Sequence, residues 1–392
     1  MKKVLLVAAT AMLLFACRKY DLQSNAFSSV NENNQVNVQI PIADTFLVNQ
    51  NLVTRGKTMR IETASLQKVI YLDLDGHTVT SPEWIGLNYG QSFFVSGVSL
   101  DASQIDIITR KLKEDFSHCD NVKVVLTEAE FLQAPIRQRV VYTTQSTVFD
   151  NVFGALGGIA QLYSFFAESD VPCFVFANHL SMNAKYMALA SSHEAGHGFG
   201  LIHSPIGLQG TGTLSWAPIM SNTGTNYYAG VTTWARGMTT ENTYQDEFEI
   251  AYSGFGENSD DAGNTIECAH SLVLSQRHFG ERETTDDADM LKYTWPTNQS
   301  FQIKFSGLSG GNIDLRVIVY KKNSLGNLVQ VKSIDQTTGL NVPENTFSKS
   351  QTGPDRSLYF RVLASNRGPS SVPPSWIPQN TSTGTYSVLV KK

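Results

Sequence analysis

Residues 191–204 read Ser-Ser-His-Glu-Ala-Gly-His-Gly-Phe-Gly-Leu-Ile-His-Ser and contain the pattern H-E-x-x-H-x-x-G-x-x-H. On a helix, His193 and His197 are four residues apart and project from the same face. Two imidazole nitrogens at that spacing can both reach one Zn²⁺ at about 2.0–2.1 Å. Gly200 lets the chain leave the helix in a left-handed conformation, which brings His203 back as a third ligand. Three protein ligands leave a fourth position open, as in catalytic zinc sites.

Glu194 directly follows the first histidine, where its carboxylate can take a proton from a water that the metal activates. The alternative is an ordinary helix with surface histidines. The chain has only 8 histidines in 392 residues. Three histidines, a glutamate and a glycine would therefore take these positions by chance in roughly one of 10⁵ such chains. The pattern favours a metal site, either catalytic or vestigial.

The eleven-residue pattern resembles the signature of the metzincin metallopeptidases. Ser204, which follows the third histidine, is similar to the residue found at that position in matrixins. Metzincins also carry a methionine in a tight turn beneath the zinc. Met220, in the run Ala217-Pro218-Ile219-Met220, lies seventeen residues after His203. It could take that role or could pack in an ordinary core. The wider run from residue 216 to 250 resembles secreted bacterial metzincins of a reprolysin-like kind.

The resemblance implies hydrolysis of internal peptide bonds, with Glu194 as general base and one catalytic Zn²⁺ held by the three histidines. In astacins and serralysins, a tyrosine two residues past the turn methionine also ligates zinc. Asn222 stands at that position, so no fifth ligand is expected. Tyr227 or Tyr228 could line the pocket for the substrate side chain after the scissile bond.

In this family the strand two elements before the zinc helix is an antiparallel sheet edge that lines the cleft. The resemblance assigns that place to Gly158, Ile159 and Ala160. An exposed edge offers unpaired N–H and C=O groups to an extended peptide, which binds as an extra strand. Alternatively, Gly157-Gly158 simply forms a loop.

The resemblance implies a catalytic domain over residues 66–256 with an α+β fold, in which a mixed twisted sheet carries the zinc helix. Strands are expected at residues 68–75, 122–126, 138–143, 157–165 and 173–178. A helical stripe runs through Ile105, Ile108, Leu112 and Phe116 after a cap at Asp101 or Ser103. His77 follows the first strand and is expected in a turn, outside the metal site.

Residues 1–17 form a predicted lipoprotein signal peptide. Lys2-Lys3 precede an apolar run from Val4 to Phe15 that is too short to span a bilayer. Leu14-Phe15-Ala16-Cys17 resembles a lipobox, in which Cys17 is acylated and becomes the new N-terminus. A plain secretory signal is the alternative. Either segment takes the protein out of the cytoplasm, and lipidation would attach it to the bacterial cell envelope, at the outer membrane or cell surface.

Residues 18–65 are rich in Asn, Gln and Ser and show little periodicity, which indicates a tether or a short pro-segment. A pro-segment could silence the enzyme by offering a carboxylate, from Asp21 or Asp44, to the open metal position. A solvated spacer is the favoured interpretation.

Residues 257–392 are expected to form an all-β sandwich, because short runs with period two alternate with Gly/Pro/Ser/Asn loops. Their opening, Asp260-Asp261-Ala262-Gly263, and the later run 285–289 resemble the bacterial pre-peptidase C-terminal domain. The acidic cluster in that run could bind Ca²⁺ or could be a solvated turn; its members are Asp286, Asp287 and Asp289.

Cysteine usage leaves two alternatives open. Three cysteines follow residue 17, namely Cys119, Cys173 and Cys268. A Cys119–Cys173 disulfide is compatible with an extracytoplasmic location. Three buried thiols are the other possibility.

The composition narrows the function classes. A formal net charge of −5 provides no basic field for nucleic acid, and no apolar run reaches the eighteen or so residues of a membrane span. We expect a monomer that acts on a protein or peptide substrate. The alternatives are a surface adhesin or glycan-binding protein with a vestigial zinc domain, and a deacetylase or amidase acting on small substrates.

Overall fold

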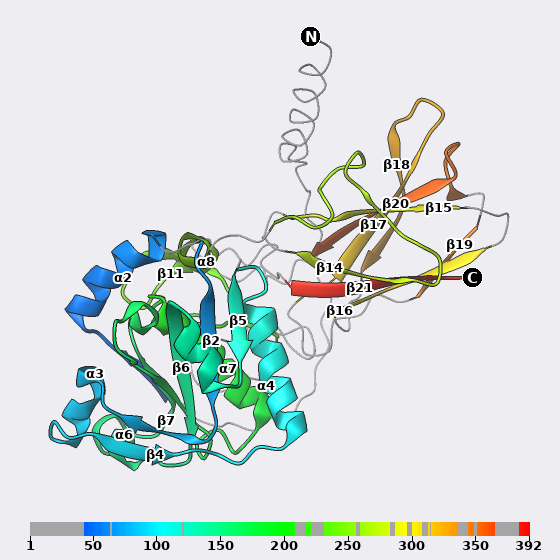
Figure 1. Cartoon of the computed structure of the whole chain (residues 1–392). Helices are drawn as coiled ribbons and strands as arrows, with labels where there is room; N and C mark the ends of the chain where they lie inside the picture. Colours follow the sequence, from blue (N-terminus) through cyan, green and yellow to red (C-terminus); the bar gives the residue numbers. More distant parts are fainter. Residues whose placement is uncertain are drawn as a thin grey trace, which may run out of the picture.

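A six-stranded mixed sheet lies at the centre of the N-terminal part of the chain (Figure 1). Neighbouring strands are parallel except for β7 and β8, which are antiparallel. The strand order is β1 (Ala43–Leu47), β7 (Leu156–Gln161), β8 (Cys173–Phe176), β6 (Ile136–Thr143), β2 (Lys68–Asp73) and β5 (Val122–Val125). Each strand predicted between residues 68 and 178 is present, although all but the third end one to four residues earlier than expected.

The computed structural model describes residues 43–62, 65–119, 121–207, 216–221, 231–255, 259–282, 287–295, 300–307, 313, 315–335, 344–348, 351–364 and 384–392. Several groups singled out in the sequence lie outside the described part. They are Cys17 with the rest of the predicted signal peptide, Asp21, the side chain of Asp44, Asn222, Tyr227, Tyr228 and Asp286.

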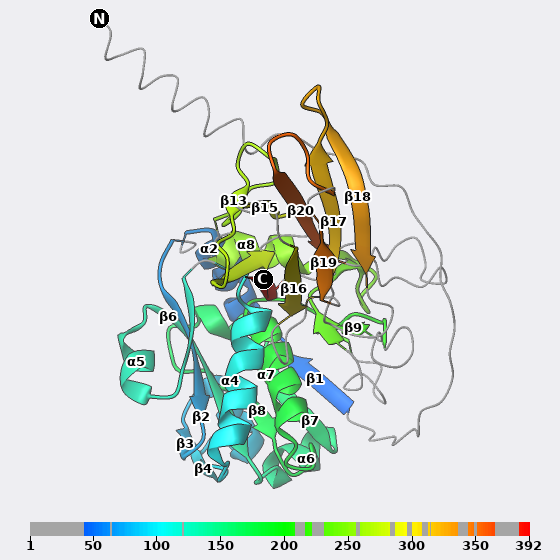
Figure 2. The same ribbon diagram turned by 90° about the vertical axis from the view of Figure 1, so that its right-hand side faces the viewer.

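Two long helices, α4 (Ala102–Asp115) and α7 (Ala184–Gly198), pack against each other beside this sheet (Figure 2). Helix α4 begins after Asp101, whose side chain accepts from the Gln104 N–H while the Gln104 side chain accepts from the Asp101 N–H. This reciprocal pair is a capping box, and it confirms the predicted start of the helix. Ile108 and Leu112 of the predicted stripe lie in the core that α4 and α7 share.

Shorter elements complete the N-terminal part of the chain. Strands β3 (Gly76–Val79) and β4 (Phe93–Ser96) form an antiparallel pair, and His77 lies within β3 instead of the expected turn. The remaining elements are α2 (Gln50–Glu62), α3 (Pro82–Ile85), η1 (Gly86–Asn88), α5 (Glu128–Gln133), α6 (Thr147–Phe153), η2 (Ser164–Phe166), β9 (Trp216–Pro218), β10 (Val231–Thr233), β11 (Arg236–Met238), β12 (Tyr244–Asp246) and α8 (Glu247–Phe255).

The expectation of a solvated spacer is wrong for residues 43–62. These residues form β1 and α2, and β1 adds a strand to the central sheet next to β7. The sequence gives little indication of these two elements, because α2 has few apolar side chains. Leu52 is buried, whereas Val53 and Met59 are only partly buried against the same core. The folded part of the chain therefore begins well before residue 66.

The C-terminal part consists of two sheets around one core, which agrees with the predicted all-β sandwich. Alternate side chains face this core, as Phe301, Ile303 and Phe305 do in β16. One sheet has the order β13 (His270–Ser271), β15 (Met290–Thr294), β20 (Ser357–Ala364), β17 (Leu315–Lys322) and β18 (Leu328–Asp335). The other has the order β14 (Arg277–Arg282), β21 (Gly384–Lys391), β16 (Phe301–Gly307) and β19 (Asn345–Phe347).

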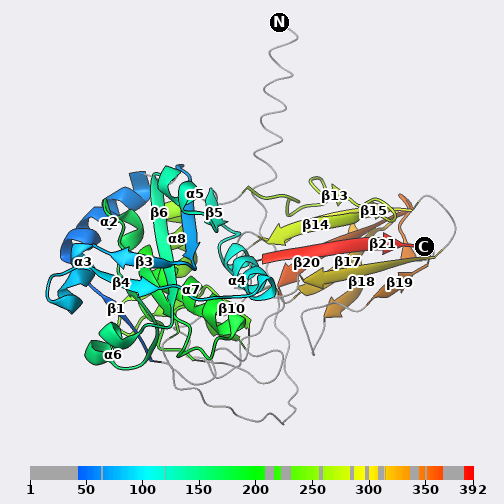
Figure 3. The same ribbon diagram turned by 60° about the horizontal axis from the view of Figure 1, so that its bottom comes forward.

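The two parts meet where the end of α4 touches the start of β21 (Figure 3). The Glu114 carboxylate accepts hydrogen bonds from the backbone N–H of Thr385 at 3.0 Å and from its hydroxyl at 2.6 Å. Among the described residues, no helix combines the length and the apolar character that a membrane crossing requires.

Candidate metal centre

Helix α7 runs through the interior of the N-terminal part, and the polar contacts along it determine how it is rotated. Asn183 caps its start by accepting from the N–H groups of Lys185 and Tyr186. Ser191 and Ser192 are fully buried, and each has a polar partner on a neighbouring element. Ser191 meets the Tyr142 hydroxyl, and Ser192 donates to Asp115. These bonds fix the rotation of the helix about its axis, and therefore the direction of the histidines that follow.

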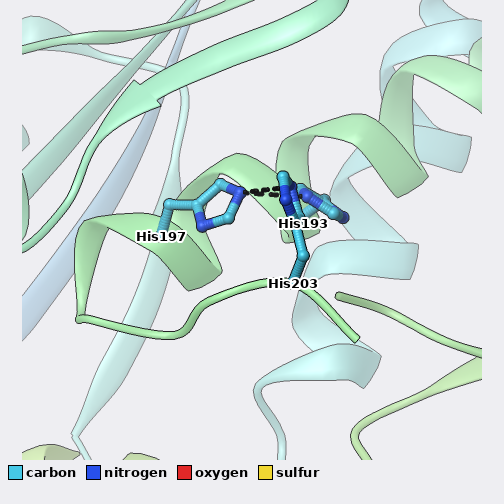
Figure 4. Close-up of side chains that lie close together, drawn as sticks. All are labelled: His193, His197 and His203. Atoms are coloured by element: carbon cyan, nitrogen blue, oxygen red, sulfur yellow. Dashed lines mark hydrogen bonds between the residues drawn. The ribbon is translucent and has the colours of Figure 1, made fainter. Parts of the chain in front are cut away.

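The three motif histidines converge on one point (Figure 4). His193 and His197 come from α7, and His203 comes from the segment that follows it. The Nε2 atom of His197 lies 3.1 Å from the Nε2 atoms of both His193 and His203. Three nitrogens bound to one tetrahedral ion at about 2.0–2.1 Å would be about 3.3 Å apart. The spacing therefore fits a single small metal ion.

The other ring nitrogens of two of these histidines are held by backbone carbonyls. The Nδ1 of His193 lies 2.6 Å from the carbonyl oxygen of Ile219, and the Nδ1 of His197 lies 2.7 Å from that of Leu201. A carbonyl oxygen can only accept, so each Nδ1 carries the proton. Each Nε2 then presents a lone pair to the shared point, as metal-binding histidines require.

Gly200 produces the bend that returns the chain to the site. Its φ is 105°, a backbone conformation that residues with a side chain rarely adopt. Space is also limiting, because a Cβ at this position would lie 2.3 Å from Cε1 of Tyr163. Position 200 therefore needs a glycine both for its backbone conformation and for the close approach of the Tyr163 ring.

Glu194 is buried next to the central sheet, with 1% of its surface exposed. A Cβ on Gly158 of β7 would lie 2.3 Å from Glu194 Oε1. The absence of a side chain at Gly158 thus creates the space that the carboxyl group occupies. The structure brings Gly158 and Glu194 together, and it leaves Ile159 and Ala160 beside them in the pairing with β1.

Met220 lies beneath the helix, on the side of Gly196. It is fully buried, and a Cβ on Gly196 would lie 2.5 Å from its sulfur atom. The Met220 carbonyl accepts from the N–H of Ser204 at 2.7 Å, which ties the turn to the segment just after His203. The neighbouring residue, Ile219, supplies the carbonyl that orients His193. The turn therefore supports two of the three histidines.

Two expectations about this region are wrong. Strand β7 is antiparallel to β8, as predicted, but it is not an exposed edge, because β1 pairs with its other side. Cys119 and Cys173 are free and buried, so they do not form a disulfide, and Cys268 is disulfide-bonded, so the alternative of three buried thiols does not hold either. Burial raises the pKa of both thiols well above the ordinary value, which keeps them protonated and unreactive.

Sequence analysis missed Phe46 and Tyr163, which both contact the site. The Phe46 ring centroid lies 4.6 Å from that of His197 and 5.1 Å from that of His203. Phe46 belongs to a segment without recognisable periodicity, so no local signal marks it. Tyr163 has a positive φ of 66°, and nothing in the sequence around it indicates that conformation.

A second group of possible metal ligands lies in the C-terminal part. Carboxylate oxygens of Asp260, Asp287 and Asp289 all lie within 4.8 Å of one another. Two members of the predicted acidic cluster are therefore close together, with Asp260 in addition. Carboxylate oxygens are ligands that Ca²⁺ prefers. A Ca²⁺ site and a solvated acidic turn therefore both remain predictions.

Comparison with known proteins gives a partial structural similarity. No protein-family model matches the chain, and no curated protein sequence matches it. The crystal structure of the pre-peptidase C-terminal domain of a collagenase from Bacillus anthracis is similar over 34% of this chain and 99% of that domain, with 13% identity and a TM-score of 0.22.

Proposed function

We propose that the protein is a zinc-dependent metalloendopeptidase of the metzincin type. The observation that carries this proposal is the convergence of three Nε2 atoms, two of them from the helix that also carries the buried carboxyl group of Glu194. A site that only held a structural ion would need no acid or base next to it. Zinc is the metal we propose because a set of three imidazoles, which leaves the fourth tetrahedral position to another ligand, suits its catalytic sites.

Each residue of the proposed site has a separate role. His193, His197 and His203 would hold the ion, which when bound supplies Lewis-acid chemistry and lowers the pKa of a water towards about 7. Glu194 takes the proton of the attacking water and passes it to the departing amine. Gly158 leaves room for that carboxyl group. Strand β7 could align an extended peptide only after β1 has left its edge.

Metal content tests the first half of the proposal. Purified protein should contain about one equivalent of zinc that a chelator removes, and His197→Ala should lose it. Replacement of the exposed Lys57 by Ala serves as the control and should leave the zinc content unchanged. Full zinc retention in His197→Ala would refute the assigned ligands.

Casein digestion tests the second half. Because β1 covers β7, the assay should use both the intact chain and a chain cut at an engineered protease site after Ser65. Glu194→Gln keeps the shape of the side chain and should keep the zinc, while turnover falls by about 10²–10⁴ or more. Digestion at the unaltered rate by Glu194→Gln would show that Glu194 is not the base.

A further inference from the structure

Strand β1 uses the edge of β7 that an extended peptide would need. Residues Thr45, Phe46 and Leu47 pair with Ile159, Ala160 and Gln161, and the Leu47 carbonyl accepts from the N–H of Leu162 at 2.8 Å. All six residues of β7 are buried. An incoming peptide cannot pair with this edge while β1 is in place.

The side chain of Phe46 extends this blockage to the histidines. Its ring packs against the rings of His197 and His203, two of the three residues that converge through Nε2. The three histidines are between 0% and 6% exposed, and Glu194 is 1% exposed. In this arrangement the site is closed to a large substrate, and Phe46 is among the side chains that close it.

Helix α2 fastens the segment from its other end. Gly56 lies so close to Tyr163 that a Cβ there would be 2.4 Å from the ring, and Tyr163 in turn packs against Gly200 of the motif. Arg55 donates from Nε to the Phe166 carbonyl at 2.8 Å and pairs with Glu168 at 2.6 Å. The helix thus docks on η2 and on the bend that carries the third histidine.

Residues 43–62 are also placed so that they can leave without dismantling the sheet. Strand β1 is at the end of the strand order and has five residues, whereas β8 is paired on both sides. It runs parallel to β7, and parallel pairing is slightly less stable per residue than antiparallel pairing. Six of the eleven described side chains of α2 are exposed, and its inward contacts come chiefly from Leu52, Arg55 and Gly56.

From this geometry we infer that residues 43–62 are a built-in inhibitory segment: β1 occupies the peptide-binding edge and Phe46 covers the histidines until the segment is displaced. The inference rests on the proposed peptidase function. It attributes the inhibition to main-chain pairing of β1 along β7 and to the aromatic ring of Phe46. While the segment is covalently attached, its effective concentration at the cleft is on the order of millimolar, and cutting the chain removes that advantage.

The test compares the intact chain with a chain cut after Ser65 and diluted to about nanomolar concentration, from which the N-terminal fragment has been removed. Amide hydrogen exchange of residues 158–161 should become at least about tenfold faster in the cut chain, and hydrolysis of a quenched peptide should rise about tenfold or more. A synthetic peptide of residues 43–62 should restore the protection and suppress hydrolysis, and the same peptide with Phe46→Ala should do so much less well.

Point variants of the uncut chain provide a second route. Phe46→Ala should raise the basal hydrolysis several-fold, whereas Val48→Ala, at a nearby position that is 50% exposed, should not. If the cut chain shows faster exchange that the peptide reverses but no form hydrolyses peptides, the inhibitory pairing stands and the proposed function fails. Unchanged exchange and activity after cutting, or loss of the fold and the zinc, would instead make residues 43–62 a permanent part of the sheet and overturn the inference.

Discussion

The contact between Gly158 and Glu194 shows how one missing side chain can control a reactive group. Glu194 Oε1 would lie 2.3 Å from a Cβ at position 158, and its Cγ would lie 2.7 Å away. Real Cβ atoms do not approach other atoms so closely, so a larger residue must displace the carboxyl group. None of the three histidines is among the nearest neighbours of position 158, so their arrangement should survive the change.

We therefore expect Gly158→Ala to keep about one equivalent of zinc while its turnover of a short peptide falls about 10²-fold, because displacement of a reacting group by about 1 Å costs roughly that factor. Gly86→Ala is the matched control, since a Cβ at Gly86 meets nothing within 4 Å. Zinc content and peptide hydrolysis measured on the same samples separate the two effects. Unaltered turnover in Gly158→Ala would show that the carboxyl group can work from another position.

At the residue level, the side chains that sequence analysis predicted are those whose spacing follows from helix geometry. His193 and His197 are one turn apart, and the bend that returns His203 needs the glycine at position 200. Phe46 could not be found in this way. Its contact with His197 joins residues far apart in the sequence, and only the pairing of β1 with β7 brings them together.

At the level of elements, strands with strong alternation or fully apolar runs were predictable, and so was α4 with its cap. The strands of the sandwich alternate in burial as the sequence alternates in polarity, as β17 shows. Helix α2 and strand β1 were not predictable, because polar side chains such as Gln50, Asn51 and Thr54 cover most of the helix surface. Tertiary contacts, rather than local patterning, determine their structure.

The first residue of α8, Glu247, gives the fold a predictable response to pH. Its carboxyl oxygen Oε2 accepts from the Ala235 N–H at 2.7 Å, and burial raises the pKa of the carboxyl group to about 8. The pKa in the unfolded chain is near the ordinary 4.5. Between these two values the folded chain retains a proton that the unfolded chain has released, so stability from this group is lost as the pH rises from about 4.5 to 8.

Glu247→Gln should remove that loss, because a glutamine stays neutral and still offers an oxygen to the Ala235 N–H. At pH 8 to 9 we expect the variant to be more stable than the unaltered chain by on the order of a few kcal/mol, with little difference near pH 4.5. Chemical denaturation across this pH range measures the difference. Glu249→Gln, at an exposed position two residues on, is the control. A constant difference between pH 5 and 9 would contradict the raised pKa.

On the scale of the whole molecule, the chain has separate apolar cores on either side of residues 256–258. The core around α4 and α7 includes residues from Leu52 to Ala251, and the core of the sandwich includes residues from Ala262 to Val390. The two clusters share no residue. The hydrogen bonds from Thr385 to Glu114 are polar contacts at the boundary between them. Each part thus has the apolar core that an independently folding domain needs.

A chain ending at Phe255 should therefore fold and bind one equivalent of zinc. Loss of the Thr385 hydrogen bonds leaves Glu114 accessible to water, so the cost should be no more than about 1–3 kcal/mol. In the Phe46→Ala background this shortened chain should hydrolyse short peptides at a rate close to that of the longer one, and large protein substrates should be the ones affected. Calorimetry, metal analysis and peptide hydrolysis on the same preparation check this, with Thr385→Val in the full chain as the control for the lost contact. A shortened chain that is folded and zinc-loaded yet inactive towards short peptides would mean that the sandwich takes part in bond cleavage itself.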